Sequence, residues 1–568
     1  MKEKKIHQGL TFLKKIRPYI NYKMFFVIVI LIGAFLRLAW LGKYPSGFFR
    51  DEAALGYNAF SIWEIGRDEF GMRLPIVFRS FEVFFLPAYV YLSVPIIGVL
   101  GLSEFSTRLL SSCSGIGGLI LTYFIAKEIW NEKVALWSTF ILAISPWHIF
   151  YSRGTFEGNL ALTFFTAGFF FWLKFIKHWK GKQFFFSTLF FALSMYSYQA
   201  ERMVVPLFAI IAVGFFWRKL WKLRGKLFLP ATIIFIFCIP LLSLTLRPGG
   251  YHRVAGVSVF SQNSKPSGWI EKREEDVFIN NNLYLRSRQL VALYSSYFSP
   301  RNLFIKGDAN RQRSVDNFSV FYPWLFPFLI YGLWHAWKKR DLNKKLLLVW
   351  MFLAPLPSAL TGDPFHTYRS LLLYLPITLF MGFGISEVLM FLKKTKISKS
   401  MSLYYLESAM IIIICIVSLS QFSFNYLVLN SATRARDWDY GYKQIVEFVG
   451  KQTGCEKIVV DDLWTESYIQ FLFFNKTQPE IYYKEVVKLA NVGEFYYNSG
   501  EKIRPISYGN FEFRKVDWPS ERGDKGTIFV MYRDALPESE FINDPKVELL
   551  KEIKYPDGEV AYRIVKII

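Results

Sequence analysis

Cysteine and histidine are scarce in this chain of 568 residues, with four and six copies. The cysteines are Cys113, Cys238, Cys415 and Cys455, three of which fall inside apolar segments, and no pair has metal-ligand spacing. The sequence therefore indicates neither a disulfide framework nor a cysteine-ligated metal. No internal repeat at a fixed period and no low-complexity tract is present, so a repeat architecture is not expected.

Large apolar side chains are abundant instead. The chain is 52% hydrophobic and 19% aromatic, with 58 Phe and 32 Tyr, and its mean hydropathy is +0.24. These values predict a polytopic membrane protein with length left over for a soluble part. A net charge of +23 would also suit a protein that binds nucleic acid. The basic clusters, however, lie between apolar runs, where Lys and Arg orient membrane proteins. Nucleic acid is therefore not an expected partner.

Apolar runs long enough to cross a bilayer predict about eleven spans. They lie near residues 24–41, 109–126, 134–150, 158–176, 184–197, 203–217, 227–246, 320–337, 345–361, 370–391 and 407–427. A further run, 86–102, carries Pro87 and Pro95. Only if this run does not cross do all the short basic loops fall on one side, so we expect it to be an in-plane or re-entrant segment.

The loop charges also predict the orientation. The basic N-terminus, which lacks a small-residue cleavage site and reads as the lead of an anchor, should be cytoplasmic. The segments expected to face outward are then 42–108, 151–157, 197–202, 362–369, the long loop 247–319 and the tail from residue 428. We hypothesise that the long loop covers the site and helps to choose the acceptor.

The tail (residues 428–568) changes character. GYKQIVEFVGKQTGCEKIVVDD indicates an amphipathic helix followed by a buried strand, and YIQFLFFN, GTIFVMYRD and VAYRIVKII are typical of short β-rich runs. We therefore expect two parts: a transmembrane part, 1–427, and a small extracytoplasmic α/β domain, 428–568.

Asp51 and Glu52 form an adjacent carboxylate pair just beyond the first span. Carboxylates near lipid cost desolvation energy, which favours chemistry or ion handling. The alternative is an exposed loop pair, or acids in the first turn of an interfacial helix, AALGYNAFSIWEIG. The next outward acids, Asp68 and Glu69 in GRDEFG, are interpreted as turn and surface residues.

Cationic candidates lie at the outer ends of other spans. Arg153, with Glu157 following, and Arg202 would suit a lipid phosphate, because guanidinium offers bidentate donors; an Arg at this depth can also simply snorkel. His366 and Arg369 have a spacing that places both on one face of a helix start, which suits a phosphate, although a lone interfacial His is commonly a hydrogen-bonded surface group.

The order and spacing of these motifs resemble a known family. The pair DE after the first span, then GRDEFG, SPWHIFYSRGTFE, SYQAERMVVPL and GDPFHTYRSLLLYLPI look like the bacterial branch of the protein O-mannosyltransferase superfamily, which includes the lipid A aminoarabinose transferases and has the GT-C glycosyltransferase fold. The likeness covers roughly residues 24–391, and the tail more loosely resembles extracytoplasmic domains of some members.

The resemblance implies transfer of a sugar from a polyprenyl-phosphate donor to a protein, lipid or polysaccharide acceptor at the outer face of a bacterial plasma membrane, with inversion. It implies that Asp51 is the base and that Glu52 is the second residue of that pair. Relatives have Arg and then Asp where this chain has Arg153 and Glu157, while His366 and Arg369 are placed by loop context alone. A divalent metal on the carboxylates is left open. The alternatives are a lipid-linked sugar flippase or transporter, and a sensor or scaffold.

Overall fold

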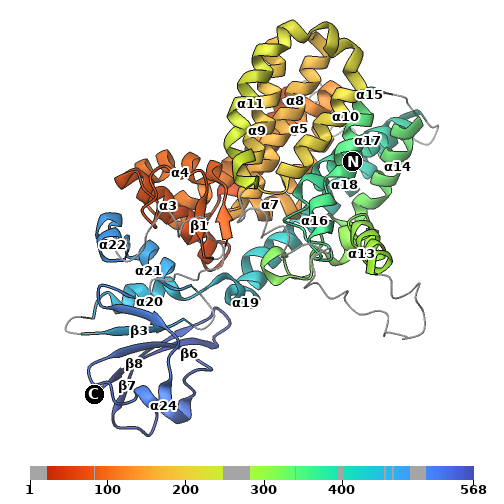
Figure 1. Ribbon diagram of the computed structural model, residues 1–568. Helices are drawn as coiled ribbons and strands as arrows, with labels where there is room; N and C mark the ends of the chain where they lie inside the picture. The colour runs from red at the N-terminus through yellow and green to blue at the C-terminus, as the bar shows by residue number, and fades with distance from the viewer. Residues whose placement is uncertain are drawn as a thin grey trace, which may run out of the picture.

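The computed structural model describes residues 22–81, 83–246, 282–338, 341–394, 401–452, 456–462, 466–486 and 507–568. A helix occupies each predicted apolar run, and these helices lie side by side in one bundle (Figure 1). They are α2 (Tyr22–Leu38), α5 (Glu104–Ile129), α6 (Glu132–Ile144), α8 (Glu157–His178), α9 (Gly181–Ser197), α10 (Glu201–Lys222), α11 (Arg224–Leu246), α14 (Phe326–Lys338), α15 (Leu342–Leu353), α17 (Leu371–Lys394) and α18 (Met401–Phe424).

Several of these helices are shorter than the predicted spans. In the described ranges, six helices are long and apolar enough to cross a membrane, or seven if α6 and α7 (Pro146–Arg153), which meet at a 58° bend, form one span. Pro146 opens α7 and accounts for the bend, because proline cannot continue the hydrogen-bond ladder of α6. The predicted run 345–361 is also broken, into α15 and α16 (Leu356–Leu360). The count of about eleven crossings therefore stays a prediction.

Glycines let α14 and α17 approach closely. A Cβ atom added at Gly332 would overlap the backbone carbonyl of Phe380, and one added at Gly384 would overlap the carbonyl of Phe328. Small residues at such crossings maximise van der Waals contact between helices in lipid, where the hydrophobic effect contributes little.

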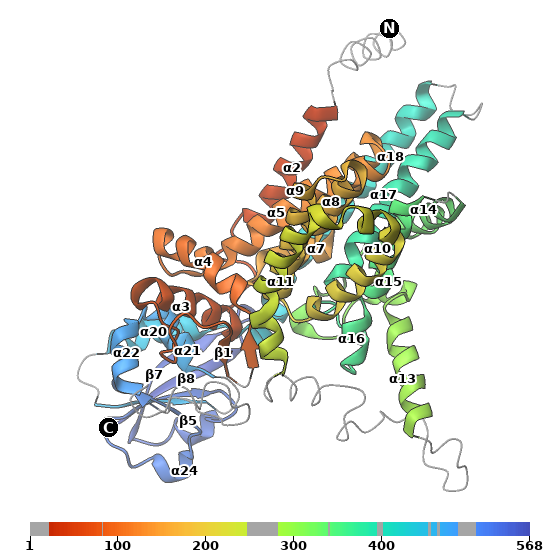
Figure 2. The same cartoon turned by 45° about the horizontal axis from the view of Figure 1, so that its top comes forward.

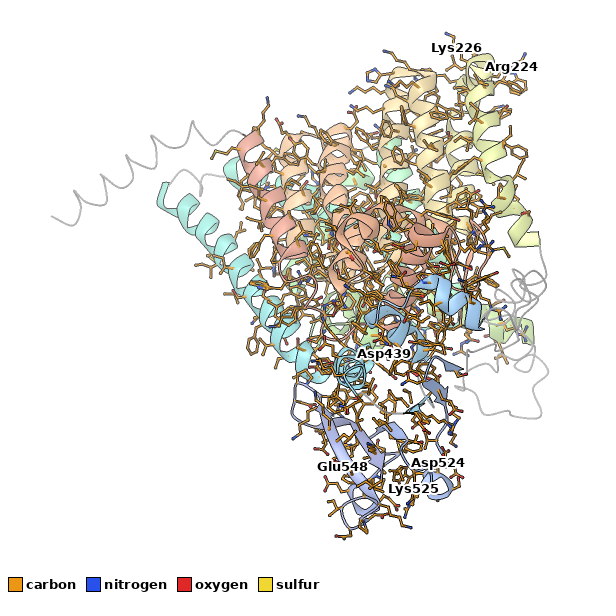
Figure 3. The ribbon with its side chains drawn as sticks, turned by 90° about the vertical axis from the view of Figure 1, so that its left-hand side faces the viewer. Arg224, Lys226, Asp439, Asp524, Lys525 and Glu548 are labelled. Carbon is orange, nitrogen blue, oxygen red and sulfur yellow. The ribbon has the colours of Figure 1, made fainter. Side chains whose placement is uncertain are left out.

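The segment after α2 lies across the long helices. It contains α3 (Arg50–Ile65), a hairpin of β1 (Phe78–Ser80) and β2 (Val83–Phe85), and α4 (Pro87–Leu100). Figures 1 and 2 place α3 and α4 between the bundle and the tail, and Figure 3 shows them nearly end-on while the bundle helices run upright. The 14 residues of α4 give a length of about 21 Å, which is too short to cross a bilayer and fits the prediction for run 86–102.

The tail is an α/β unit, as the sequence predicts. Its six-stranded sheet has the order β4-β5-β3-β6-β8-β7, with β3 parallel to β5 and β6 and the outer pairs antiparallel. The strands are β3 (Ile458–Asp461), β4 (Ser507–Tyr508), β5 (Phe511–Arg514), β6 (Ile528–Tyr532), β7 (Val547–Lys554) and β8 (Val560–Ile567). The helices are α20 (Tyr442–Val449), α21 (Tyr468–Phe474), α22 (Pro479–Val486) and α24 (Trp518–Glu521).

One tail prediction is wrong. The segment YIQFLFFN is helix α21 and not a strand, although it is rich in residues that favour strands. The helix is apolar on all sides because it packs between α3 and the sheet, where Phe473 stacks near Phe48 of the first loop at 4.5 Å and Phe471 meets Phe511 at 5.1 Å. Tertiary burial thus overrides local propensity.

The tail and the α3–α4 segment share one hydrophobic core, which runs from Phe48 and Tyr57 to Phe471, Tyr482 and Ile564. Helix α18 passes through the π-helical turn Asn425–Leu429 into α19 (Asn430–Thr433), so the helical run extends beyond residue 427. The division of the chain at 427/428 stays a prediction. Arg224 and Lys226, in the first turn of α11, lie at the opposite end of the molecule from the tail residues Asp439 and Glu548 (Figure 3).

Candidate active site

The two acids of the first loop have different environments. Both lie in the first turn of α3, which confirms the helix considered for this stretch. Glu52 is buried, and its Oε1 and Oε2 accept hydrogen bonds from Arg108 Nε at 2.9 Å and Nη2 at 2.8 Å. Thr155 donates to Oε1 through its backbone N–H at 2.8 Å and its hydroxyl at 2.9 Å, and Phe49 N donates to Oε2 at 3.2 Å. These donors use the accepting capacity of the carboxylate.

Arg108 explains why Glu52 is fixed. Its guanidinium is fully buried and also donates to the backbone carbonyls of Leu41, Pro45 and Gly47. The pair therefore joins the start of α5, the turn before α3 and the second outer segment at Thr155. A bidentate, charge-assisted pair of this kind holds geometry tightly.

Asp51, in contrast, is only partly buried. Its neighbour Arg50 turns toward the tail: the Arg50 backbone N–H donates to Asp439 Oδ2 at 3.0 Å, and its Nη1 lies 3.9 Å from Glu466 Oε2. Burial raises the pKa of the Asp439 carboxyl, and Arg50 opposes that shift. The tail is thus fastened to the residue that precedes the candidate base.

Arg153 is buried and caps helix α2. Its Nη1 donates to Leu36 O at 2.9 Å and its Nη2 to Ala39 O at 2.8 Å. Arg37 of α2 caps a different helix, since it donates to Leu142 O and Ala143 O at the end of α6. Carbonyls at a helix C-terminus lack intrahelical donors, so each guanidinium satisfies groups that would otherwise be unpaired. As a phosphate ligand, Arg153 stays a prediction.

The second, third and fourth outer segments meet around Tyr368. Gly158 N donates to the Tyr368 hydroxyl at 3.0 Å, and the rings of Tyr368 and Tyr198 lie 4.9 Å apart. Glu157 interacts electrostatically with both Tyr368 and Glu201.

Glu201 is buried at the first position of α10, and its Oε2 has no hydrogen-bond partner in the described residues. Arg202 follows it, partly buried, in the same turn. The arrangement therefore brings Glu157, Glu201 and Tyr368 together from three stretches of sequence, with Arg202 adjoining.

His366 and Arg369 lie in the turn before α17 and not on the predicted helix start, although both side chains approach Asp363. Arg369 N donates to His366 Nδ1 at 3.2 Å, while Arg369 Nη1 donates to Thr361 Oγ1 at 2.7 Å and to Asp363 Oδ2 at 3.2 Å. Burial lowers the pKa of His366 to about 2, with further lowering by the charges of Arg313 and Arg369. The imidazole is thus neutral near pH 7, and Arg369 carries the positive charge of this turn.

The long loop contributes residues that sequence reasoning missed. Asp308 is buried, and its Oδ2 accepts from Thr367 N at 2.9 Å, from Thr367 Oγ1 at 2.8 Å and from Arg313 Nε at 3.1 Å. The Thr367 hydroxyl lies 2.6 Å from that of Tyr151. The end of the loop is therefore packed against two of the other outer segments, and the run GDANRQRS was its only visible signal.

The interpretation of Asp68 and Glu69 as surface residues is wrong, because both are buried. Asp68 does make the predicted turn, accepting from Phe70 N and Met72 N through Oδ1. Glu69 accepts from Asn58 Nδ2 at 3.2 Å, and burial raises its pKa to about 8. The packing of the tail over this loop covers side chains that the sequence alone would leave in water.

A divalent metal on the first-loop carboxylates does not fit this arrangement. In the described ranges, no three His, Cys, Asp or Glu side chains gather as a ligand set. Glu52 is already saturated by Arg108, Thr155 and Phe49, so the pair does not present two open carboxylates.

Comparison with known proteins agrees with the resemblance drawn from the motifs. Residues 87–244 match the family model described as dolichyl-phosphate-mannose-protein mannosyltransferase. No curated protein sequence matches the chain.

Solved structures show the same fold. ArnT from Cupriavidus metallidurans in the apo state superposes with a TM-score of 0.51 at 12% identity, covering 95% of this chain and 96% of that one. The same protein bound to undecaprenyl phosphate gives a TM-score of 0.54 at 11% identity, covering 95% and 97%. At such low identity the likeness shows the fold alone, which is the predicted GT-C fold. The chain is thus a multi-span membrane protein with this fold, and its residues 87–244 are similar to the protein mannosyltransferases.

Proposed function

We propose that the protein transfers a sugar from a polyprenyl-phosphate donor to an acceptor hydroxyl, with Asp51 as the general base. The observation that carries the proposal is the contrast within the carboxylate pair. Glu52 is buried and held by Arg108 and Thr155, while Asp51, on the same helix turn, is only partly buried and follows Arg50, which contacts the tail.

The chemistry follows from this placement. The acceptor oxygen bonds to the anomeric carbon, its proton passes to Asp51, and the bond from that carbon to the phosphate oxygen breaks. A hydroxyl is a weak nucleophile, and a base within hydrogen-bond reach removes its proton as the bond forms. Attack from the side opposite the phosphate inverts the anomeric centre. Glu52 positions Asp51 by fixing the first turn of α3 and does not take the proton.

The leaving lipid phosphate requires cations more than an acid, because its charge develops as the bond breaks. Arg369, which is partly exposed and lies in the fourth outer segment, is the strongest candidate of this structure. Arg202 adjoins the cluster of Glu157 and Tyr368, and the neutral His366 orients Arg369 through the bond to its backbone. Arg153 contributes to the site indirectly, because it caps the C-terminal end of α2.

The membrane placement follows from charge. The tail and the α3–α4 segment lie at one end of the bundle, and the basic residues Arg224 and Lys226 at the start of α11 lie at the other (Figure 3). Because Lys and Arg favour the cytoplasmic side, the proposed site faces the exterior of a plasma membrane, where lipid-phosphate sugars and envelope acceptors meet.

The test is direct. Purified protein in nanodiscs is incubated with a panel of polyprenyl-phosphate sugars and with peptide, lipid and saccharide acceptors, and products are identified by mass spectrometry. We expect one donor to give an acceptor-dependent glycoside and free polyprenyl phosphate. Transport of a lipid-linked sugar across the bilayer without any glycoside formed would contradict the proposal and favour a flippase.

A further inference from the structure

A cavity of about 400 Å³ lies where the first outer segment meets the tail. Its wall is formed by the link between α2 and α3, by the start of α5, and by the tail around residues 439–444. Neither the motifs nor the catalytic arrangement above uses it. The volume falls within the range of about 300–1,000 Å³ that is usual for small-molecule sites.

The cavity is linked to the start of α3 through Asp439. Asp439 lines it, and the same carboxylate accepts from the backbone N–H of Arg50 at 3.0 Å and lies 3.4 Å from Arg50 Nε. Arg50 is the residue before Asp51, so the wall of the cavity is linked through Asp439 to the helix turn that carries the proposed base. The two sides of the wall are tied together, since Lys443 Nζ donates to Glu104 Oε1 at 2.9 Å.

The lining is suited to a hydroxyl-rich ligand. It offers an ammonium group at Lys43, an amide at Gln444, a buried carboxylate at Asp439 and the phenol rings of Tyr44 and Tyr440. Sugar hydroxyls both donate and accept, so they match a wall of mixed donors and acceptors. The apolar faces of sugar rings pack on aromatic side chains, while the phenol oxygens stay available for hydrogen bonds. An acyl chain, in contrast, could form no hydrogen bonds with the polar groups of this wall.

We infer that this cavity binds the saccharide part of the acceptor, beside the turn that leads into α3. As an acceptor site it rests on the proposed function. It also gives the tail a role, because Asp439, Tyr440 and Gln444 belong to the tail while Lys43 and Tyr44 belong to the first loop. Acceptor choice is then made where the two parts meet.

The test measures binding without catalysis. Full-length protein in nanodiscs, which avoid glycoside detergents, is mixed with methyl hexosides and hexose disaccharides, and saturation-transfer NMR reports the bound sugar. The wild type should bind at least one of them. A Lys43→Ala/Gln444→Ala variant should bind it roughly tenfold more weakly, because it loses two ligand hydrogen bonds. Glu447→Ala, on an exposed position of the same helix α20, is the matched control and should bind as the wild type does.

The outcomes are separable from those of the transfer assay. Equal sugar binding by the double variant and the wild type overturns the inference. It is also overturned if the double variant loses the binding of a Ser/Thr peptide and keeps the binding of the sugar. If the wild type transfers sugar and the double variant keeps its KM for the acceptor, the inference fails while the proposed function stands. If sugars bind in the cavity but no donor is ever consumed, the proposed function fails. Unchanged thermal unfolding of both variants serves as the folding control.

Discussion

Substitutions at the adjacent residues 51 and 52 should have opposite consequences. Asp51→Asn keeps the shape of the side chain and removes a charge that is only partly buried, so stability should change by less than about 1 kcal/mol. A general base contributes about 10²–10⁴ in rate, which corresponds to about 3–5 kcal/mol of the barrier. Transfer should therefore fall by at least about a hundredfold in a protein that is still folded.

Glu52→Gln should act on stability first. The amide turns a donor toward Arg108, Thr155 or Phe49, all of which are donors themselves. It also leaves the Arg108 guanidinium buried without a counter-charge, and breaking a buried pair in this way costs about 3–5 kcal/mol. Thermal unfolding in nanodiscs, followed by tryptophan fluorescence, measures the loss. Glu52→Gln/Arg108→Met is the matched control and should regain part of it, because neither charge is then left alone.

The assays are the initial rate of transfer from labelled donor and the unfolding temperature on the same preparations. Wild-type transfer by Asp51→Asn would refute its role as base. A Glu52→Gln variant as stable as the wild type would refute the view that the Arg108 pair fixes α3.

Further predictions concern other parts of the molecule. Since burial raises the pKa of Glu69 to about 8 from an ordinary 4.5, the folded state holds this proton more tightly than the unfolded state does. The protonated Glu69 side chain contributes its full share to stability below pH 4.5, the ordinary pKa, and this share is lost as the pH rises through 8. Glu69→Gln should therefore reduce the fall of the unfolding temperature with rising pH. A variant whose unfolding temperature falls as steeply as that of the wild type would contradict this. Arg153→Lys should reduce stability by about 1–3 kcal/mol and so lower the unfolding temperature, because a lysine ammonium lacks the planar fork with which arginine reaches both carbonyls at the end of α2; an unaltered melting curve would exclude the cap. Gly384→Ala should cost about 1–3 kcal/mol by forcing α14 from α17, whereas Gly214→Ala, with open space around it, should be neutral or stabilising by up to about 1 kcal/mol; equal melting of the two variants would refute the close-packing argument.

Local patterns were sufficient for much of the fold. Apolar runs located the bundle helices, and strand-like runs located β6 and β8. They failed where a neighbour decides the outcome: YIQFLFFN is a helix because α3 and the sheet bury all its faces, and the run 134–150 bends at Pro146. Those environments are made by distant residues.

The candidate site was predicted in part. The four outer segments do converge, through Thr155 on Glu52, Gly158 on Tyr368 and the rings of Tyr198 and Tyr368. Asp308 and Arg108 were missed, because an acid in a long polar loop and an arginine at the start of an apolar run carry no distinctive spacing. Their importance lies in partners that are far away in the chain.

The sequence by itself determined the class of the protein, the positions of its apolar helices and the end of the bundle at which its polar segments gather, because hydropathy and loop charge are properties of short stretches. It could not show that the carboxylates at 51 and 52 have different environments, since two neighbouring acids look alike in one dimension. The tertiary structure shows the difference, because the guanidinium of Arg108, 56 positions away, holds the buried carboxylate of Glu52, while Asp51 is only partly buried.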